Sequence, residues 1–275
     1  MRKKKQVLVS VVMPVYNNEK YVSEAIESIL NQSYTNFEFI IIDDCSTDNS
    51  WQVIKRFAKK DNRIRCYRNE KNLKIVKTRN KGLDLCNKNS KYYAPMDSDD
   101  IAISNRLEKE VNFLEENKEY VAVGSNIILI DENSKKIGYR KYPQTYNKIK
   151  KIITRYSPMA QPSTLIRKDI LLKEGKYNEK YTRSQDYELW MRLANKYKIK
   201  NLGDYLLKYR ITETQGKTTH LKQTIKFTLN IQKKYLFKPK FFNPLNIIYF
   251  IGKFILLILP KGIVLRLFKM VTYKK

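Results

Sequence analysis

The sequence predicts an α/β protein built on a mostly parallel sheet with helices on both of its faces. Two observations support this fold class. Residues 7–13 and 37–42 are short, nearly continuous apolar runs, which are typical of strands buried on both faces of a parallel sheet. Segments with an apolar stripe at helical spacing follow these runs, and alternation of strand and helix favours right-handed crossovers between parallel strands.

The first strand and helix occupy residues 7–30. The β-branched run at residues 7–13 ends at Pro14, and Asn18 is placed to cap the helix that follows. The apolar positions of this helix share one stripe, as expected of a helix that covers a sheet. They are Val22, Ala25, Ile26, Ile29 and Leu30.

Three further strands are predicted in the first hundred residues. The run at residues 37–42 ends in two aspartates, Asp43 and Asp44, before a polar turn into a second helix. Residues 64–67 and 92–96 predict the third and fourth strands, with a helix between them.

The second half continues the alternation less regularly. Residues 105–117 predict a helix, and residues 121–124 and 127–130 predict two strands. Residues 184–186 open another helix, in which Trp190 and nearby leucines are expected to belong to the core.

Three carboxylates follow the fourth strand within four residues, in the order Asp97, Ser98, Asp99 and Asp100. An isolated motif of this kind is most often a solvated acidic turn. Carboxylate oxygens also suit Mg²⁺ or Mn²⁺, which proteins usually bind through one or two carboxylates together with substrate phosphates. The position of the motif decides between these interpretations.

Other polar side chains are predicted at the same edge of the sheet. Tyr16 follows the first strand and Asp44 the second, as the acidic motif follows the fourth. Because ligands of parallel sheets bind beyond the carboxyl ends of the strands, this convergence favours a binding site. The sequence has neither GxxxxGK[ST] nor GxGxxG, so phosphate must be held by a metal and cationic side chains.

The composition adds a net charge of +28, which calls for an anionic partner such as nucleic acid, a phosphate-bearing substrate or anionic lipid. Cys45, Cys66 and Cys86 have no CxxC spacing and His220 is the only histidine, which disfavours a zinc site. Reduced thiols are the default expectation. The basic start and residues 7–15 resemble a signal peptide, but the run is short and contains proline, so we interpret it as the first strand.

Residues 214–275 contain no Asp or Glu and many Lys residues, with apolar runs at residues 247–251 and 254–259. Basic residues beside apolar segments suit an anionic membrane surface. The runs are short for a membrane span, which needs about 20 residues. We therefore predict an amphipathic anchor that lies on the membrane, arranged as a helical hairpin, with an ordinary packing helix as the alternative.

Six segments form an ordered set over roughly residues 6–212. They are residues 9–17 (VSVVMPVYN), 41–48 (IIDDCSTD), 78–83 (TRNKGL), 97–100 (DSDD) with Arg106 and Leu107, 161–163 (QPS) with Arg167, and 185–193 (QDYELWMRL). Each segment alone is a weak signal, but the ordered set is specific. It resembles glycosyltransferase family 2, whose members are inverting enzymes of the GT-A fold.

The resemblance implies a donor site at the strand ends. Asp44 would contact the base of the nucleotide, and Pro14 and Tyr16 would line the pocket for the base and ribose. Arg79 would lie near the base or the diphosphate. Each has an ordinary alternative: Asp44 as a turn residue, Tyr16 as an aromatic at the edge of the core, and Arg79 as a solvated helix residue.

The resemblance also implies the groups nearer to the chemistry. Asp97, with Ser98 beside it, would approach the ribose, and Asp99 would bind the divalent metal, Mn²⁺ or Mg²⁺. Asp186 would be the catalytic base, and its alternative is an acid at a helix N-terminus. Cys45 stands where the family usually has glycine, so an unusual backbone angle is expected there.

Two further features concern how this chain compares with particular members of the family. The QxxRW signature of processive synthases is absent, so a non-processive enzyme is expected. His220 lies beyond the segments that match the family. Some relatives use a late histidine as a metal or phosphate contact, but a surface histidine is favoured here.

The implied organisation is a GT-A domain at residues 1–212 and a basic, apolar helical extension at residues 213–275. Within the domain, residues 1–100 would form the Rossmann-like half that binds the nucleotide-sugar. Residues 101–212 would form the acceptor half, with residues 158–163 as a loop on the acceptor side.

We therefore predict a metal-dependent enzyme that transfers a sugar from UDP-hexose or UDP-N-acetylhexosamine to a lipid-linked, lipopolysaccharide or capsule glycan, with a β-glycosidic product. It would lie on the inner face of the cell membrane. The alternatives are a transferase with a soluble acceptor, an inactive membrane scaffold of the same fold, and a basic nucleic-acid-binding protein. The last is disfavoured because carboxylates collected at strand ends repel phosphate without a metal.

Overall fold

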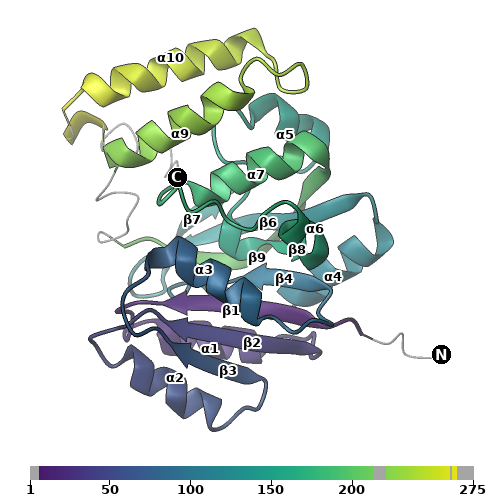
Figure 1. The fold of residues 1–275 in the computed structure, drawn as a ribbon, viewed down its shortest axis with the longest axis vertical. Coiled ribbons are helices and arrows are strands. Elements are labelled where there is room, and N and C mark those ends of the chain that lie inside the picture. Colours follow the sequence, from purple (N-terminus) through teal and green to yellow (C-terminus); the bar gives the residue numbers. More distant parts are fainter. Residues whose placement is uncertain (1–5, 213–220, 261, 265–275) are drawn as a thin grey trace.

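The computed structural model describes residues 6–212, 221–260 and 262–264. At its centre is one nine-stranded sheet in the order β3-β2-β1-β4-β8-β6-β9-β5, with β7 beside β6. Helices cover both faces of this sheet, and α9 and α10 lie at the end of the molecule opposite α2 (Figure 1). The predicted α/β fold class is confirmed.

The first half of the sheet is entirely parallel. Its strands are β1 (Val9–Val15), β2 (Phe37–Asp43), β3 (Ile64–Arg68) and β4 (Tyr92–Pro95). Strand β1 pairs with β2 and β4, and β2 pairs with β3. Every residue of β1 and β2 is buried, because helices cover both sides of these strands. That burial explains why their sequences are nearly continuously apolar.

Four helices form the two layers around this half. They are α1 (Val22–Leu30), α2 (Ser50–Ala58), α3 (Lys74–Leu85) and α4 (Arg106–Glu116). Helices α1, α2 and α4 share a core with Val11, whereas α3 shares the opposite core with Val12. A Cβ on Gly82 of α3 would lie 2.3 Å from Val12 Cγ1. Glycine therefore lets α3 approach the sheet closely, and Arg79 lies one turn earlier on the same helix.

The second half of the sheet is mixed. Its strands are β5 (Ile101–Ala102), β6 (Tyr120–Ile130), β7 (Lys136–Arg140), β8 (Leu165–Arg167) and β9 (Lys198–Arg210). Strand β6 is parallel to β9 and antiparallel to β7 and β8.

The prediction of two separate strands at residues 121–124 and 127–130 was wrong, because β6 runs through both. Polar Asn126 interrupts the apolar pattern, and the ladder with β9 shifts register there without ending. The Asn126 side chain donates to the carbonyl of Gly203 at 2.8 Å and accepts from the amide of Tyr142 at 2.8 Å. These bonds satisfy its amide inside the protein.

The remaining helices of this half cover the face that α3 covers. They are α5 (Tyr146–Ile152), the short 3₁₀ helix η1 (Gln161–Ser163), α6 (Lys168–Lys173) and α7 (Gln185–Lys196). Helix α7 begins where the sequence predicted a helix. Trp190 and Leu193 are fully buried, which confirms their assignment to the core.

The expected cap of the first helix was also wrong. Helix α1 begins at Val22 after Tyr21, and no side chain caps it. The carbonyl of Asn18 accepts from the amides of Tyr21 and Val22 at 3.1 and 3.0 Å. Its side chain instead donates to Ser98 Oγ at 2.8 Å, so a contact across the edge of the sheet replaces the local cap.

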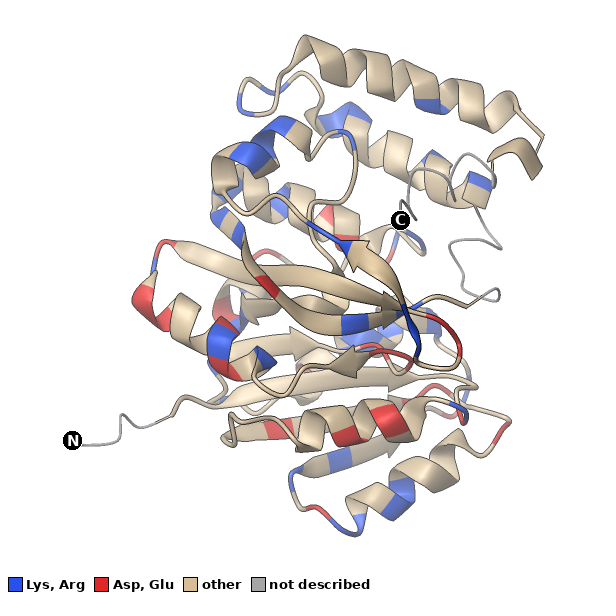
Figure 2. Cartoon of the chain, turned by 180° about the vertical axis from the view of Figure 1, so that it is seen from behind, with Lys and Arg blue, Asp and Glu red and all other residues tan. Residues whose placement is uncertain are grey.

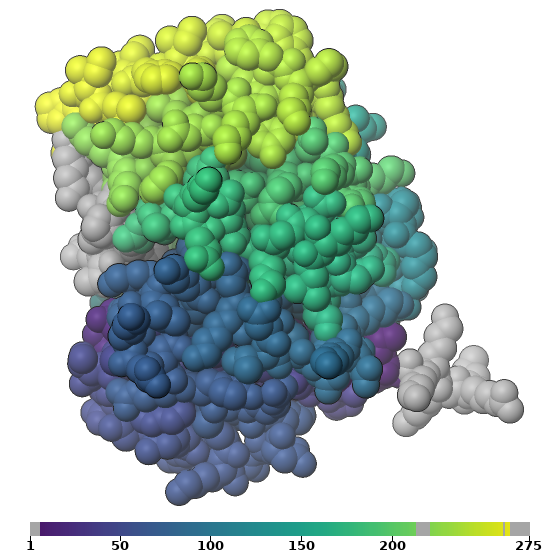
Figure 3. Space-filling model, in the orientation of Figure 1, coloured from purple at the N-terminus to yellow at the C-terminus, as the bar shows by residue number. Residues whose placement is uncertain are grey.

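The C-terminal extension is a pair of packed helices, α9 (Leu221–Tyr235) and α10 (Pro244–Ile258). Ile231 of α9 and Phe241 share a buried cluster with Trp190, so the pair is attached to the second half of the sheet. Figure 3 shows its atoms as one end of the molecule. Across the described part of the chain, no helix is both long and apolar enough to cross a bilayer.

Candidate active site

Three loops meet at the carboxyl edge of the parallel strands. They follow β1, β2 and β4, and side-chain bonds join them. The amide of Asn17 donates to Ser46 Oγ at 3.0 Å, and the amide of Asn18 donates to Ser50 Oγ at 2.8 Å. With the bond from Asn18 to Ser98, these contacts connect all three loops. The convergence that the sequence predicted at this edge is present.

Asp44 is buried and its carboxylate organises the start of α3. Oδ1 accepts from Asn69 Nδ2 at 2.7 Å and from the amide of Leu73 at 2.8 Å. Oδ2 accepts from the amide of Lys74 at 2.9 Å. A carboxylate has about four acceptor positions, so one remains for a ligand such as a nucleotide base. The sequence missed this structural function of Asp44.

Positive φ angles occur in two of these loops and at the starts of α3 and α7. Cys45 has a φ of 63°, in the left-handed region that favours glycine, as expected from its departure from the family pattern. Asn17, Lys74 and Ser184 also have positive φ, at 46°, 69° and 56°. Such strained residues gather at ligand-binding sites, where the surrounding bonds hold them in place.

Arg79 and Asp97 form the central ion pair of the site. The guanidinium Nη2 donates to Asp97 Oδ1, and the Arg79 side chain is only 4% exposed. Burial lowers the pKa of Arg79, but the charge of Asp97 and then Tyr177, Tyr93 and Asp186 raise it overall. The buried guanidinium is therefore held by the acidic loop that follows β4.

Asp186 lies in the first turn of α7, and its residue is half-buried. Ser184, just before the helix, has the left-handed backbone that turns the chain into α7. Fully buried Trp190 holds α7 against the core, so the carboxylate is carried by a rigid element.

Tyr177 is a site residue that the sequence did not single out. Its ring centroid lies 6.0 Å from Arg79 Cζ, and its hydroxyl accepts from Gln161 Nε2 at 2.6 Å. Asn80 secures its backbone, since Asn80 Nδ2 donates to the Tyr177 carbonyl at 2.9 Å and Asn80 Oδ1 accepts from its amide at 3.0 Å. Tyr177 lies in a loop without periodicity, and only the QPS segment, with Gln161, could have indicated it.

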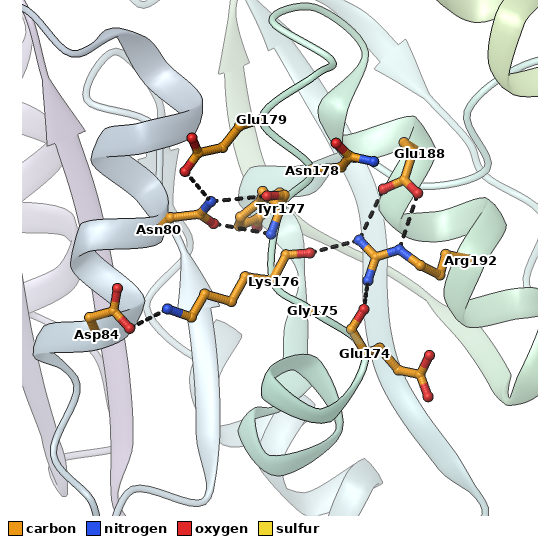
Figure 4. Close-up of a pocket in the computed structure, with 10 residues that line it drawn as sticks. All are labelled: Asn80, Asp84, Glu174, Gly175, Lys176, Tyr177, Asn178, Glu179, Glu188 and Arg192. Carbon is orange, nitrogen blue, oxygen red and sulfur yellow. Dashed lines mark hydrogen bonds and ion pairs between the residues drawn. The ribbon is translucent and has the colours of Figure 1, made fainter.

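A cavity of about 530 Å³ lies between α3, the segment after α6, and α7 (Figure 4). Its polar side chains are bonded to each other or to nearby backbone: Lys176 pairs with Asp84, and Arg192 pairs with Glu188 at 2.9 Å. Arg192 also donates to the carbonyl of Lys176 at 2.6 Å. Neither Asp99 nor Asp186 lines this cavity. We interpret the bonds among its lining residues as structural contacts that hold the Tyr177 segment between α3 and α7.

The acidic motif is anchored by Arg210 at the end of β9. Arg210 Nε donates to the carbonyl of Asp99 at 2.8 Å, and its amide donates to Asp100 Oδ1 at 2.9 Å. Burial, followed by the charges of Asp100, Asp99 and Asp97, raises the pKa of Tyr209 well above its usual value. The charges of the acidic loop thus reach Tyr209, which is half-buried on β9. The sequence indicated neither Tyr209 nor Arg210.

The other predicted site residues occupy the same edge. Pro14 is buried at the end of β1, and Tyr16 is 49% exposed. The Ser98 hydroxyl accepts from Asn18. His220 lies outside the described residues.

A divalent cation fits this edge only together with a substrate. Among the residues that the structure describes, no group of three or more His, Cys, Asp or Glu side chains forms a ready metal site. Asp97 is paired with Arg79, whereas Asp99 is half-buried beside it. One carboxylate plus substrate phosphates is a common way to bind Mg²⁺, so these residues fit a cation that arrives with a phosphate-bearing ligand.

Solved structures of low sequence identity share this fold. A mannosyltransferase of Pyrobaculum calidifontis, solved with GDP-Man and Mn²⁺, aligns with a TM-score of 0.63 and 14% identity, covering 97% of this chain and 81% of that one. S. aureus TarS 1–349, solved with UDP-GlcNAc, aligns with a TM-score of 0.60 and 21% identity, covering 81% and 66%. Both are glycosyltransferases with the GT-A type of sheet.

Sequence comparisons give the family directly. An uncharacterized glycosyltransferase of Methanocaldococcus jannaschii is 38% identical over 249 residues, which are 88% of this chain and 83% of the relative. The O-antigen biosynthesis glycosyltransferase WbnJ of Escherichia coli is 37% identical over 212 residues, or 74% and 80%. The profile of glycosyl transferase family 2 matches residues 10–174. The strand-end loops, the acidic motif that follows β4 and these relatives lead to one conclusion: the chain belongs to glycosyl transferase family 2.

Proposed function

We propose that this chain is a non-processive inverting glycosyltransferase that uses UDP-hexose or UDP-N-acetylhexosamine. Its acceptor would be a hydroxyl of a lipid-linked, lipopolysaccharide or capsule glycan, and the product a β-glycoside. The observation that carries the proposal is the buried Arg79, which pairs with Asp97 of the acidic loop. This ion pair supports a cationic donor site beside the acidic loop, and Asp186, in the first turn of α7, is the candidate base.

On the donor side, Asp44, Pro14 and Tyr16 would hold the nucleoside. The Asp44 carboxylate is preorganised by three hydrogen bonds and keeps capacity for a base. The exposed ring of Tyr16 offers a surface for stacking. Arg79 would face the diphosphate, and its bond to Asp97 fixes its direction.

Asp99 would hold Mn²⁺ or Mg²⁺, with Asp97 and Ser98 beside it on the ribose side. When bound, such a cation neutralises negative charge on the leaving nucleoside diphosphate. Arg210 holds the main chain of Asp99 and the side chain of Asp100, so the loop has a defined shape before the donor binds.

Asp186 would take the proton of the acceptor hydroxyl as that oxygen attacks the sugar carbon from the side opposite the diphosphate. General base catalysis typically contributes about 10²–10⁴-fold to a rate. A single displacement inverts the anomeric centre, so an α-linked donor gives a β-linked product. The helix N-terminus favours the ionised carboxylate that this step needs.

The relatives support the choice of substrates. TarS was solved with UDP-GlcNAc, and WbnJ acts in O-antigen biosynthesis. We accordingly propose residues 1–212 as the catalytic domain, with the donor half at residues 1–100 and the acceptor half at residues 101–212. Residues 213–275 would be the membrane-associating extension, on the inner face of the cell membrane.

The proposal is tested with nucleoside diphosphates and nucleotide-sugars, each titrated with and without Mn²⁺ by calorimetry and assayed for transfer to extracted glycolipid. Asp186→Asn is expected to lower kcat by about 10²–10⁴-fold while UDP binding stays unchanged. Asp169→Asn is the matched control, because Asp169 lies in the first turn of another helix, α6.

Full turnover by Asp186→Asn would remove Asp186 from catalysis. Salt-sensitive RNA binding that ignores UDP and Mn²⁺ would instead favour the nucleic-acid alternative.

A further inference from the structure

Helix α10 buries a polar side chain and exposes its apolar ones, which is the reverse of an ordinary surface helix. Its one buried residue is Asn246, which is 0% exposed. Its outward face carries large apolar side chains that are roughly half exposed or more: Leu245, Ile248, Tyr249, Ile251, Phe254, Ile255 and Ile258. A continuous apolar face of this kind marks an interaction site, because water opposes its exposure.

The buried face of α10 explains why this orientation is fixed. Asn246 Nδ2 donates to Thr154 Oγ1, and Asn246 Oδ1 accepts from Arg155 Nε at 2.5 Å. Lys253, two turns later on the same face, donates from Nζ to the carbonyl of Arg155. These polar contacts hold one side of α10 on the turn after α5, so the apolar side points outward.

The charges around α10 indicate the partner. Residues 221–258 contain no Asp or Glu and seven lysines. These are Lys222, Lys226, Lys233, Lys234, Lys238, Lys240 and Lys253. All except Lys253 are exposed, on α9 and the segment that joins it to α10. Figure 2 shows these lysines in blue on α9 and the connecting segment, with no Asp or Glu on either helix. A second copy of this chain would bring two cationic surfaces together, so charge favours an anionic partner.

We propose that α10 binds the surface of an anionic lipid bilayer, with its apolar face in the interface and the lysines of α9 and the connecting segment at the headgroups. An apolar helix face with adjacent lysines is the arrangement of an interfacial helix. Helix α10 has 15 residues, which is shorter than the roughly 20 residues of a spanning helix. It therefore lies along the surface.

The attachment connects this lipid-binding face to the candidate active site. Gln232 of α9 donates to the carbonyl of Arg155 and to the hydroxyl of Tyr187, each at 3.2 Å. Tyr187 follows Asp186 in α7 and donates to the carbonyl of Ile153 at 2.5 Å. The turn at residues 153–155 thus joins α10, α9 and α7. Bound lipid would lie in a fixed orientation to the site, which suits the lipid-linked acceptor of the proposed function on which this inference rests.

Vesicle sedimentation of the full chain tests the inference without any need for turnover. Vesicles of phosphatidylcholine with phosphatidylglycerol are expected to bind the protein. Affinity for vesicles of phosphatidylcholine alone should be at least about fivefold lower, because one lysine near anionic lipid contributes a factor of about five to the affinity. The double variant Ile248→Glu, Ile255→Glu should weaken binding by at least about tenfold, since each buried methylene contributes about fourfold. Both side chains are more than half exposed, so the fold is expected to survive.

The matched control is the double variant Ile137→Glu, Leu172→Glu, which adds the same charges at exposed apolar positions outside α9 and α10. It should bind vesicles as the unchanged protein does. Equal binding to both vesicle types, or equal loss in both variants, would overturn the inference. So would a stable dimer in sedimentation equilibrium that Ile248→Glu, Ile255→Glu dissociates. Vesicle binding is measured independently of transfer. A protein that binds these vesicles as expected but transfers no sugar in the assay above would contradict the proposed function and leave this inference standing.

Discussion

Helices α7 and α10 are both rich in apolar residues, yet the structure uses them in opposite ways. Helix α7 buries eight of its 12 residues, including Trp190, and leaves Asp186 half-buried at the active edge. Helix α10 buries only Asn246 of its 15 residues. The difference shows that an apolar stripe predicts a helix face whose side chains have to be shielded from water. The surrounding elements decide what shields them.

In α7 the cover comes from this chain, from the sheet and from α9. In α10 one side packs on α9 through Phe250, Leu256 and Leu257 and bonds to the turn after α5, and we propose lipid as the cover of the other side. Three experiments test the comparison, in decreasing order of expected effect.

The largest effect is expected in α7. Trp190→Ala removes a fully buried ring and should lower the free energy of unfolding by about 3–5 kcal/mol. Ile258→Ala in α10, where the side chain is 83% exposed, should change it by no more than about 0.5 kcal/mol. Urea unfolding of both variants without lipid measures the contrast. Comparable losses would mean that the apolar face of α10 is covered in solution.

The next effect concerns the buried amide of α10. Asn246→Leu removes the partner of the buried Thr154 hydroxyl and of Arg155 Nε, and an unsatisfied buried group costs about 1–3 kcal/mol. Hydrogen exchange of α10 amides should become faster, while that of α7 should change little. Asn230→Leu is the control, because Asn230 is exposed on α9. Unchanged protection of α10 in Asn246→Leu would show that its polar contacts do not hold it.

The smallest effect is a pH dependence. Burial lowers the pKa of Lys253 from 10.5 to about 8. Between these values the unfolded chain binds more protons, so stability should rise as the pH increases from about 8 toward 10.5. Lys253→Met should reduce this rise, as measured by the thermal unfolding midpoint across the same pH range. An identical slope in both proteins would mean that Lys253 is solvated.

The candidate site was predictable where its residues follow strands. Asp44 and the acidic motif come directly after apolar runs, and parallel strands bring their carboxyl ends together. Tyr177 and Arg210 were missed because neither belongs to a local pattern: one lies in an aperiodic loop and the other at the end of a long strand. Their importance arises from contacts with residues about 100 positions away.

The two corrected expectations have a related cause. Asn18 fits a local cap, but its side chain bonds to Ser98, 80 positions along the chain. Asn126 looks like a break between strands, but Gly203 and Tyr142 satisfy its amide and β6 continues. Both side chains form bonds that only the folded chain makes available.

By itself the sequence determined the alternation of strands and helices, the polar groups at the strand ends, and the basic, apolar nature of the last segment. These follow from periodicity and from chain direction, which are local properties. Only the tertiary structure decided that Arg79 is buried and paired with Asp97, and that Asn246 of α10 points into the protein. Where these side chains lie depends on which distant groups can pair with a buried charge or hydrogen-bond a buried amide. Burial of a polar group without such a partner raises the free energy of the folded state.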